Sequence, residues 1–318
     1  METPVVLNPA QQRVIEALGR SGDRAALADD FGDRLRLGLT DGLAGVAAAL
    51  DPSRPLWISK HALATVHTCE AHHQALDAAE FVWTVPTARG TVAHKAIELA
   101  VHWKGEPVPG DLVDEALARL VDQEDGLGQF VAGLGAADVA ELRAIAVERV
   151  SKFQECFPPL KAAWIPVTES KARVELFDGA LVLAAKTDLT LGRPGEKVIV
   201  DFKSGRVHAQ HGDDLRFYAL VETIRLAPPR KLASYELDSA RLLVEDVKDT
   251  TLYAALRRTI EGIAAIIELR AGRQPRKRVG PVCRWCPILA SCTEGQAERA
   301  RADDDAADTD LRVEADAW

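Results

Sequence analysis

The sequence predicts a mixed α/β fold, in which helices precede and follow a central sheet. Apolar residues recur with the 3.6-residue period of helices as far as Pro158-Pro159. The period changes to two, as in strands, between residues 164 and 203, and helix and strand patterns then alternate to residue 270. The chain has 318 residues, 47% of them hydrophobic and 27% charged, as is typical of soluble globular proteins. It has no run of about 18 apolar residues, so no transmembrane helix is expected.

The first half of the chain is predicted to be helical. Residues 1–55 are rich in alanine, and Asn8-Pro9 is a typical start of a helix. Ser59 is a candidate N-cap for a helix that continues through Leu76. Further helices are expected over 91–103, 111–121 and 136–155, and the two prolines that follow end this block.

The central sheet is predicted from four short runs of apolar residues. These strands are expected over 164–169, 173–177, 181–190 and 197–203. Asp178-Gly179 is a tight-hairpin signal between the second and third strands. Val198-Ile199-Val200 is continuously apolar, as in a strand that is buried on both faces. A helix over 212–225, strands over 231–237 and 241–247, and a helix over 250–270 are expected to follow.

The chain is expected to divide into four parts. They are a helical extension over 1–55, the main domain over 56–272, a basic loop with a cysteine-rich segment over 273–295, and an acidic tail over 296–318. Residues 303–318 hold seven acidic residues and one arginine, a net charge of −6, so the tail is predicted to be disordered. The first residues lack the basic start and apolar core of a signal peptide, so a cytoplasmic location is expected.

Two neighbouring predicted strands each carry a carboxylate. Asp188 lies on one, and Asp201 and Lys203 lie two residues apart on the next, so they project from one face. Two carboxylates can hold a hard cation such as Mg²⁺ beside a phosphate, and a lysine can orient water or stabilise developing charge. This chemistry suits phosphodiester hydrolysis. The alternative is that Asp201 and Lys203 form an ion pair at the end of a strand.

A histidine precedes these residues on a predicted helix. The order is glycine at Gly90, His94 on the helix, Asp188 on a strand and Asp201-x-Lys203 on the next strand. Over about residues 57–293 the chain thus resembles the PD-(D/E)xK nuclease superfamily, specifically its RecB-like or Cas4-like branch. The resemblance implies a restriction-endonuclease-like mixed sheet flanked by helices. It also implies Mg²⁺ or Mn²⁺ held by His94, Asp188 and Asp201, with Lys203 as the catalytic lysine.

That branch carries a Gln-x-x-x-Tyr motif on the next helix. Tyr218 stands at the tyrosine position, whereas Asp214 stands at the glutamine position. The resemblance makes Tyr218 a candidate DNA-binding residue, and the aspartate is a departure from the pattern.

The cysteines form a second constellation. Cys283, Cys286 and Cys292 have the spacing C-x₂-C-x₅-C, and Cys69 is the candidate for a distant fourth thiol. This pattern is similar to that of the iron–sulfur nucleases of the RecB-like branch, which implies that the four cysteines hold a [4Fe–4S] cluster. A structural Zn²⁺ site is the alternative, with His72 or His73 as a nitrogen ligand.

Basic residues gather directly before the cysteines. The candidates for phosphate contacts are Arg273, Arg276, Lys277 and Arg278. Trp285 is expected to pack against the cluster, with stacking on a base as the alternative. The net charge of −9 excludes a uniformly basic DNA coat protein but not a nuclease with a local basic path.

The resemblance implies a metal-dependent DNA nuclease in repair or recombination. We expect an exonuclease that acts on DNA ends or single strands, with a helicase or recombination protein as a possible partner and no membrane association. One alternative is a non-catalytic DNA-binding or scaffold subunit that retains the nuclease fold. Another is a zinc-stabilised regulator.

Overall fold

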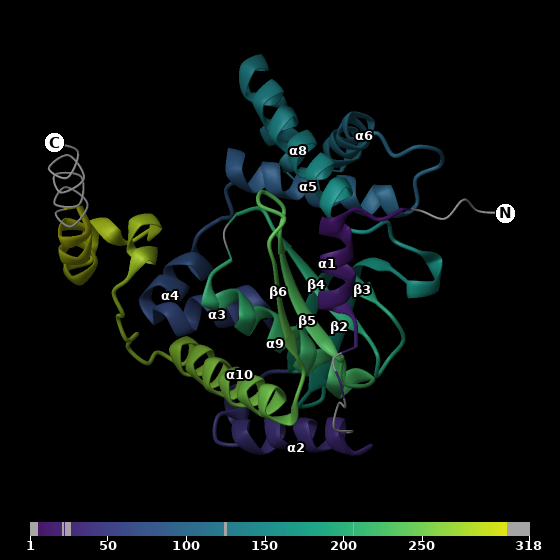
Figure 1. Cartoon of the computed structure of the whole chain (residues 1–318). Coiled ribbons are helices and arrows are strands. Elements are labelled where there is room, and N and C mark those ends of the chain that lie inside the picture. The colour runs from purple at the N-terminus through teal and green to yellow at the C-terminus, as the bar shows by residue number, and fades with distance from the viewer. Residues whose placement is uncertain (1–5, 21, 23–26, 124–125, 206, 304–318) are drawn as a thin grey trace, which may run out of the picture.

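A six-stranded mixed sheet lies between two layers of helices (Figure 1). The computed structural model describes residues 6–20, 22, 27–123, 126–205 and 207–303. The strands are β1 Leu56–Ile58, β2 Val167–Leu176, β3 Leu181–Leu191, β4 Val198–Lys203, β5 Lys231–Glu236 and β6 Leu242–Asp246. Their order is β1-β3-β4-β5-β6, and β2 pairs with β3 as well. The β1–β3 and β4–β5 pairs are parallel and the other pairs antiparallel, which confirms the predicted mixed sheet.

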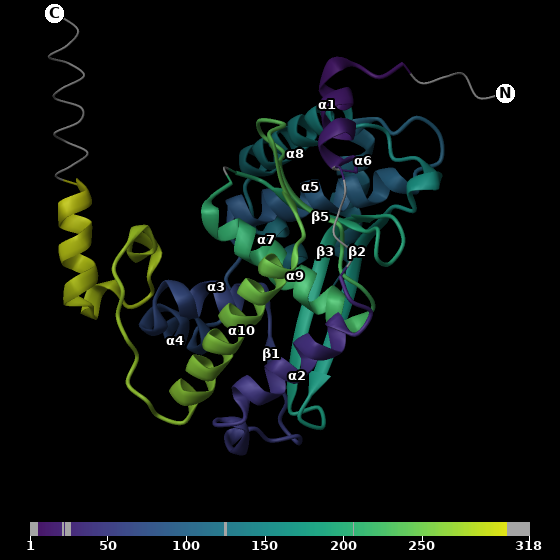
Figure 2. The ribbon, with the colours of Figure 1, turned by 60° about the horizontal axis from the view of Figure 1, so that its bottom comes forward.

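Each face of the sheet has its own apolar core. One core holds α1 Pro9–Leu18, α5 Val85–Val101, α6 Pro109–Asp122, α7 Leu127–Ala132 and α8 Ala136–Cys156. The other holds α2 Phe31–Leu43, α3 Lys60–Thr68, α9 Ala209–Arg225 and α10 Asp249–Arg270. The short helix α4 Glu70–Ala78 follows α3, and Figure 2 shows α10 running beside α3. The structure is therefore a helix–sheet–helix sandwich.

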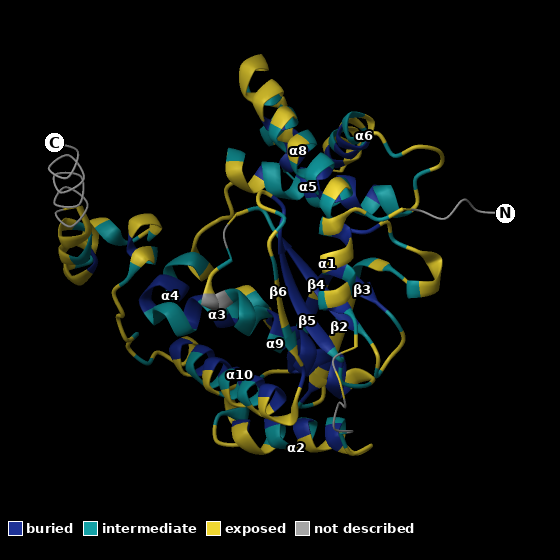
Figure 3. Ribbon diagram, in the orientation of Figure 1, coloured by how far each residue is buried: buried dark blue, intermediate teal, exposed yellow. Residues whose placement is uncertain are grey.

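Strand β4 lies in the middle of both cores. Val198 and Val200 pack into the core with α5 and α8, whereas Ile199 packs into the core with α9 and α10. The central strands β3, β4 and β5 are mostly buried and dark blue in Figure 3. The continuous apolar run of β4 is explained by this burial on both faces, as predicted.

The predicted hairpin at Asp178-Gly179 is confirmed. It joins β2 to β3, with Leu176 paired to Leu181, and Gly179 takes a φ of 87° that suits glycine. The two strands expected over 164–169 and 173–177 are one strand, because β2 pairs with β3 from Val167 to Leu176, with a break only at Glu169. Trp164 lies instead in a short 3₁₀ turn, Ala162–Trp164.

The helix predicted from Ser59 is interrupted at Cys69. Ser59 does cap α3, because its side chain accepts a hydrogen bond from the Ala62 N–H. Cys69 has extended backbone angles, φ −163° and ψ 118°, which end α3 and separate it from α4. Helix α5 begins at Val85, six residues before the predicted start, and α7 was not predicted.

Residues 1–55 share the two cores with the main domain. Leu35, Leu39 and Leu43 of α2 are fully buried beside α9 and α10, and α1 packs on α8. At the other end, residues 293–303 are helical, which corrects the prediction of disorder from residue 296. The Arg299–Asp303 ion pair, one helical turn apart, helps this segment to be a helix. The remainder of the tail lies outside the described residues, and the division into four parts stays a prediction.

No helix among the described residues has the length and apolar character needed to span a membrane.

Candidate active site and cysteine cluster

The residues predicted to form an active site meet where β3 and β4 separate. The β3–β4 ladder ends at the pair Leu189–Val200, so Asp188 and Asp201 occupy the next position of the same register. Instead of a ladder bond, the Phe202 N–H donates to Asp188 Oδ2 at 2.6 Å. The Asp188 carboxylate thereby links the two strands at this point.

Helix α5 brings His94 to the same place. His94 Nδ1 lies 3.3 Å from Asp188 Oδ1. Burial lowers the pKa of His94, but the Asp188 carboxylate and neighbouring acids outweigh it and raise the pKa above its ordinary value. Gly90 allows α5 to approach β4 closely, because a Cβ there would lie 3.0 Å from the Ser204 hydroxyl.

Glu169 of β2 completes a group of three possible metal donors. Ligand atoms of His94, Glu169 and Asp188 all lie within 4.8 Å of one another, and all three side chains are partly buried. A carboxylate-rich group with one imidazole can hold a divalent cation such as Mg²⁺ or Mn²⁺.

Glu169 was not predicted as a site residue, although the sequence contains a signal for it. The pairs Thr168–Leu189 and Ser170–Thr187 place residue 169 opposite Asp188. The hairpin at Asp178-Gly179 fixes this register, so the contact could have been deduced once the hairpin was predicted. Glu169 itself has a φ of 52°, which interrupts the ladder at that position.

Asp201 lies outside this group of three and contacts two lysines instead. Its carboxylate is 2.7 Å from Lys203 Nζ and 2.9 Å from Lys60 Nζ, and the side chain is only 1% exposed. Burial raises the pKa of Asp201, but the two ammonium groups outweigh it and hold the pKa below its usual range. Of the predicted metal ligands, the structure thus brings His94 and Asp188 together, with Glu169 beside them and Asp201 facing the lysines.

Lys60, at the start of α3, was not predicted as a site residue. Besides its hydrogen bond to Asp201, its ammonium lies 4.9 Å from the centre of the Tyr218 ring. Burial lowers the pKa of Lys60, but Asp201 and Tyr218 outweigh it and raise the pKa above its ordinary value. The side chain is therefore held as a cation. No local pattern marks this lysine, because 141 residues separate it from Asp201 in the sequence.

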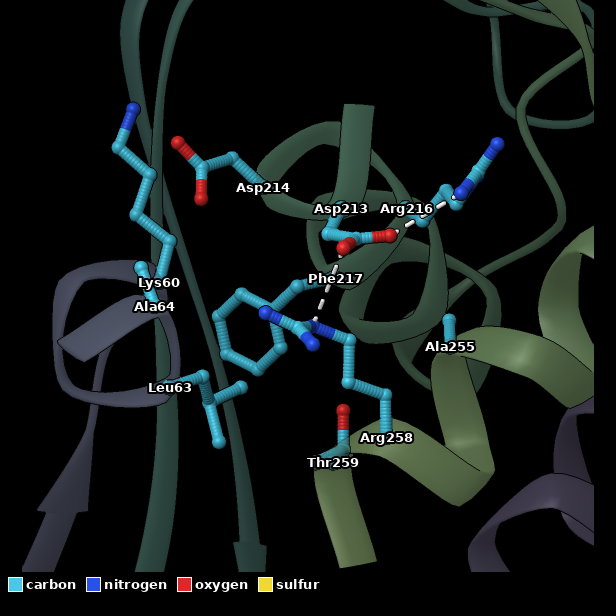
Figure 4. A pocket seen from close by; sticks show the side chains of 10 residues that line it. All are labelled: Lys60, Leu63, Ala64, Asp213, Asp214, Arg216, Phe217, Ala255, Arg258 and Thr259. Atoms are coloured by element: carbon cyan, nitrogen blue, oxygen red, sulfur yellow. Dashed lines mark hydrogen bonds and ion pairs between the residues drawn. The ribbon is translucent and has the colours of Figure 1, made fainter. Parts of the chain in front are cut away.

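Helix α9 contributes the two residues at the Gln-x-x-x-Tyr positions. Asp214 Oδ2 lies 3.6 Å from Lys203 Nζ, and burial raises the pKa of Asp214. Figure 4 shows the Asp214 carboxylate and the Lys60 ammonium at the same end of one pocket. Tyr218 is only 3% exposed and its ring lies against Lys60. The contact with DNA predicted for Tyr218 stays a prediction.

The four cysteines predicted to act together line one pocket. They come from the junction of α3 and α4 and from the segment after α10, which lies beside α4 in both Figures 1 and 2. The residues are Cys69, Cys283, Cys286 and Cys292. Burial and the other three cysteines raise the pKa of Cys286, although the backbone at Ile288 opposes this. Four thiols that face one pocket are a donor set for a thiolate-bound metal centre.

The basic loop before the cysteines is largely engaged within the protein. Arg273 donates two hydrogen bonds of 2.9 Å to Glu70, and Lys277 pairs with Glu294 at 2.9 Å. The first pair ties the loop to α4, and the second ties it to the segment that follows Cys292. We therefore expect Arg273 and Lys277 to bind phosphate less strongly, because acidic partners already compensate both charges.

Arg276 and Arg278 remain candidates for the predicted phosphate contacts. Both are exposed. The Arg278 guanidinium donates to the neutral His67 carbonyl at 2.9 Å, and its backbone N–H lies 3.5 Å from Cys69 Sγ. These two arginines are the better candidates for phosphate contacts.

Trp285 was expected to pack against the cluster, but it does not line the cysteine pocket. Its side chain is 70% exposed and is not among the described residues that line the pocket. The Arg284 guanidinium lies 5.7 Å from the ring centre. The ring is thus free to stack on another group, which was the alternative.

The chain is similar to one known protein family and to several solved structures. Residues 58–293, about three quarters of the chain, match the PD-(D/E)XK nuclease superfamily. A crystal structure described as a "Putative exonuclease" from Eubacterium rectale is 11% identical, with a TM-score of 0.44 over 80% of this chain and 90% of that chain. The crystal structure of SSO0001 is 14% identical, with a TM-score of 0.30 over 66% of this chain and 97% of that chain. No curated protein matches the sequence.

Proposed function

Because the chain belongs to the PD-(D/E)XK nuclease superfamily, we propose that it is a metal-dependent deoxyribonuclease of the RecB-like branch. Its substrates would be DNA ends or single strands in repair or recombination. Its partners would be DNA and a helicase or recombination protein that exposes such strands.

The observation that carries this proposal is the group of three donors beside a lysine-bound carboxylate. The ligand atoms of His94, Glu169 and Asp188 lie within 4.8 Å of one another, close enough to hold one Mg²⁺ or Mn²⁺ ion. The bound metal would polarise a phosphoryl oxygen and lower the pKa of a bound water. Asp201 would stand at the edge of this group, as a further ligand or as the anchor of Lys203.

Lys203 supplies the positive charge next to the metal position. Its side chain is 15% exposed, and its ammonium lies near the carboxylates of Asp201 and Asp214. A lysine held in this way can orient the attacking water or stabilise the charge that develops on the phosphate. The simple ion pair at the end of a strand remains the competing interpretation, and it predicts no effect of Lys203 beyond stability.

We propose in addition that the four pocket cysteines hold a [4Fe–4S] cluster. All four cysteines line one pocket, which supports a single centre that they hold together. Four thiolates are the usual ligand set of a [4Fe–4S] cluster, and a zinc ion with four cysteine ligands is the alternative. Such a centre would join α4 to the C-terminal segment and close a very long loop of chain.

Cleavage of labelled DNA tests the nuclease proposal. Linear and circular substrates, single- and double-stranded, are incubated with Mg²⁺, with Mn²⁺ or with a chelator. We expect linear DNA to be degraded with either metal, circular DNA to persist, and Lys203→Met to abolish cleavage without loss of folding. Lys104→Met is a matched control, because Lys104 is exposed and lies outside the site. Unchanged cleavage by Lys203→Met would contradict the site, and DNA binding without cleavage would favour a scaffold subunit.

Metal analysis of anaerobically purified protein tests the cluster. We expect a brown protein with iron and acid-labile sulfide in equal amounts. A colourless protein that contains one zinc per chain would overturn the iron–sulfur assignment and favour the zinc-stabilised regulator.

A further inference from the structure

His72 is the one imidazole among the described residues that line the cysteine pocket. Its side chain is buried, with 6% of the residue exposed. Its Nδ1 atom is inaccessible and has no hydrogen-bond partner in the described part of the chain. Burying a polar atom without a hydrogen bond costs free energy, so we expect a group bound in the pocket to supply the partner.

The neighbouring histidine shows what an ordinary buried imidazole does on this helix. His73 is 7% exposed, and its Nδ1 lies 2.8 Å from the Thr65 hydroxyl. It does not line the cysteine pocket. The two histidines are adjacent on α4 and are buried to a similar extent. They differ in that Nδ1 of His73 has a hydrogen-bond partner within the protein.

The local fold brings His72 to the same pocket as Cys69. Cys69 is extended and precedes α4, and the first helical bond of α4 runs from the His73 N–H to the Cys69 carbonyl at 2.9 Å. His72 therefore lies in the first turn of α4, three residues after Cys69, and both line the pocket. An imidazole carries at least one ring N–H whether it is neutral or protonated, so His72 has a hydrogen bond to donate.

We propose that His72 is a positioning residue of the cysteine centre, whose ring N–H donates a hydrogen bond to a sulfur of the group held there. The inference rests on the proposed iron–sulfur cluster. The four thiolates already fill the ligand set of such a cluster, so the imidazole acts through a sulfur and not as a ligand. Hydrogen bonds of this kind stabilise a metal centre and its ligands.

The test compares His72→Leu with His73→Leu in the full-length protein, reconstituted with iron and sulfide without oxygen. The readout is the rate at which iron passes to a chelator. We expect His72→Leu to lose iron about 10- to 100-fold faster than wild type, the range found when groups that support metal ligands are removed. His72→Asn, which keeps an N–H donor, should be intermediate, and His73→Leu should be close to wild type.

Thermal unfolding of the metal-free protein separates this role from a structural one. His72→Leu removes an unsatisfied buried atom, so the metal-free variant should unfold at the wild-type temperature or above. Iron loss at the wild-type rate, or a lower unfolding temperature without metal, would overturn the inference. If wild-type protein takes up no iron and sulfide, the proposed cluster itself fails and the inference fails with it.

Discussion

The substitution Glu169→Gln tests the proposed metal ligand that the structure places beside Asp188. The change removes one of two carboxylate charges from the group of His94, Glu169 and Asp188, and it leaves the side-chain size the same. Lys186, the ion-pair partner of Glu169, is 58% exposed, so water can solvate its charge after the change. We therefore expect a specific loss of metal affinity without unfolding.

The loss of metal affinity can be estimated. Removing groups that merely orient a metal ligand costs about 10- to 100-fold in affinity, and Glu169 would touch the metal itself. At a metal concentration of 100 times the dissociation constant, binding stabilises the wild type by about 2.7 kcal/mol. A variant with 100-fold weaker binding keeps about 0.4 kcal/mol. The metal-induced rise in unfolding temperature should then shrink by roughly 5 °C, at about 2 °C per kcal/mol for a large domain.

The assay is thermal unfolding with and without Mg²⁺ or Mn²⁺, supported by calorimetric titration. Glu175→Gln is the matched control, because Glu175 lies on the same strand and is 52% exposed beside Arg173. Its metal-induced shift should equal that of the wild type. If Glu169→Gln also keeps the full shift, Glu169 is not a ligand and the proposed donor group is wrong.

Three further predictions concern residues around the site. Lys60→Met removes the hydrogen bond to the buried Asp201, so the free energy of unfolding in urea should fall by roughly 1–2 kcal/mol, and an unchanged value would contradict the contact. Trp285→Ala should weaken binding of single-stranded DNA by about 1–3 kcal/mol in fluorescence anisotropy, whereas Trp57→Ala, also exposed, should not; equal effects would exclude stacking at Trp285. Arg276→Ala should lower the slope of DNA affinity against salt concentration by about 1, and an unchanged slope would exclude a phosphate contact.

The sequence was informative where local patterns decide the structure. The apolar run of β4 and the hairpin at Asp178-Gly179 predicted the centre of the sheet, and the order of His94, Asp188 and Asp201-x-Lys203 predicted which residues meet there. These features depend on residue spacing along single strands and helices, which can be read from one sequence.

Contacts between distant segments could not be predicted in the same way. Lys60 reaches Asp201 because α3 packs beside α9 below the sheet, and nothing near Lys60 in the sequence signals this. The pairing of Glu70 with Arg273 is similar, because it depends on how the segment after α10 folds back on α4. Charges counted along the sequence therefore overestimated the basic surface available to DNA.

His94, Glu169 and Asp188 are the proposed ligands of the catalytic metal. Anomalous diffraction from crystals soaked in Mn²⁺ tests this most directly, because it locates the ion without reference to activity. We expect a manganese peak bounded by these three side chains, with Asp201 and Lys203 beside it. Manganese bound elsewhere, with this group empty under conditions that support DNA cleavage, would contradict it.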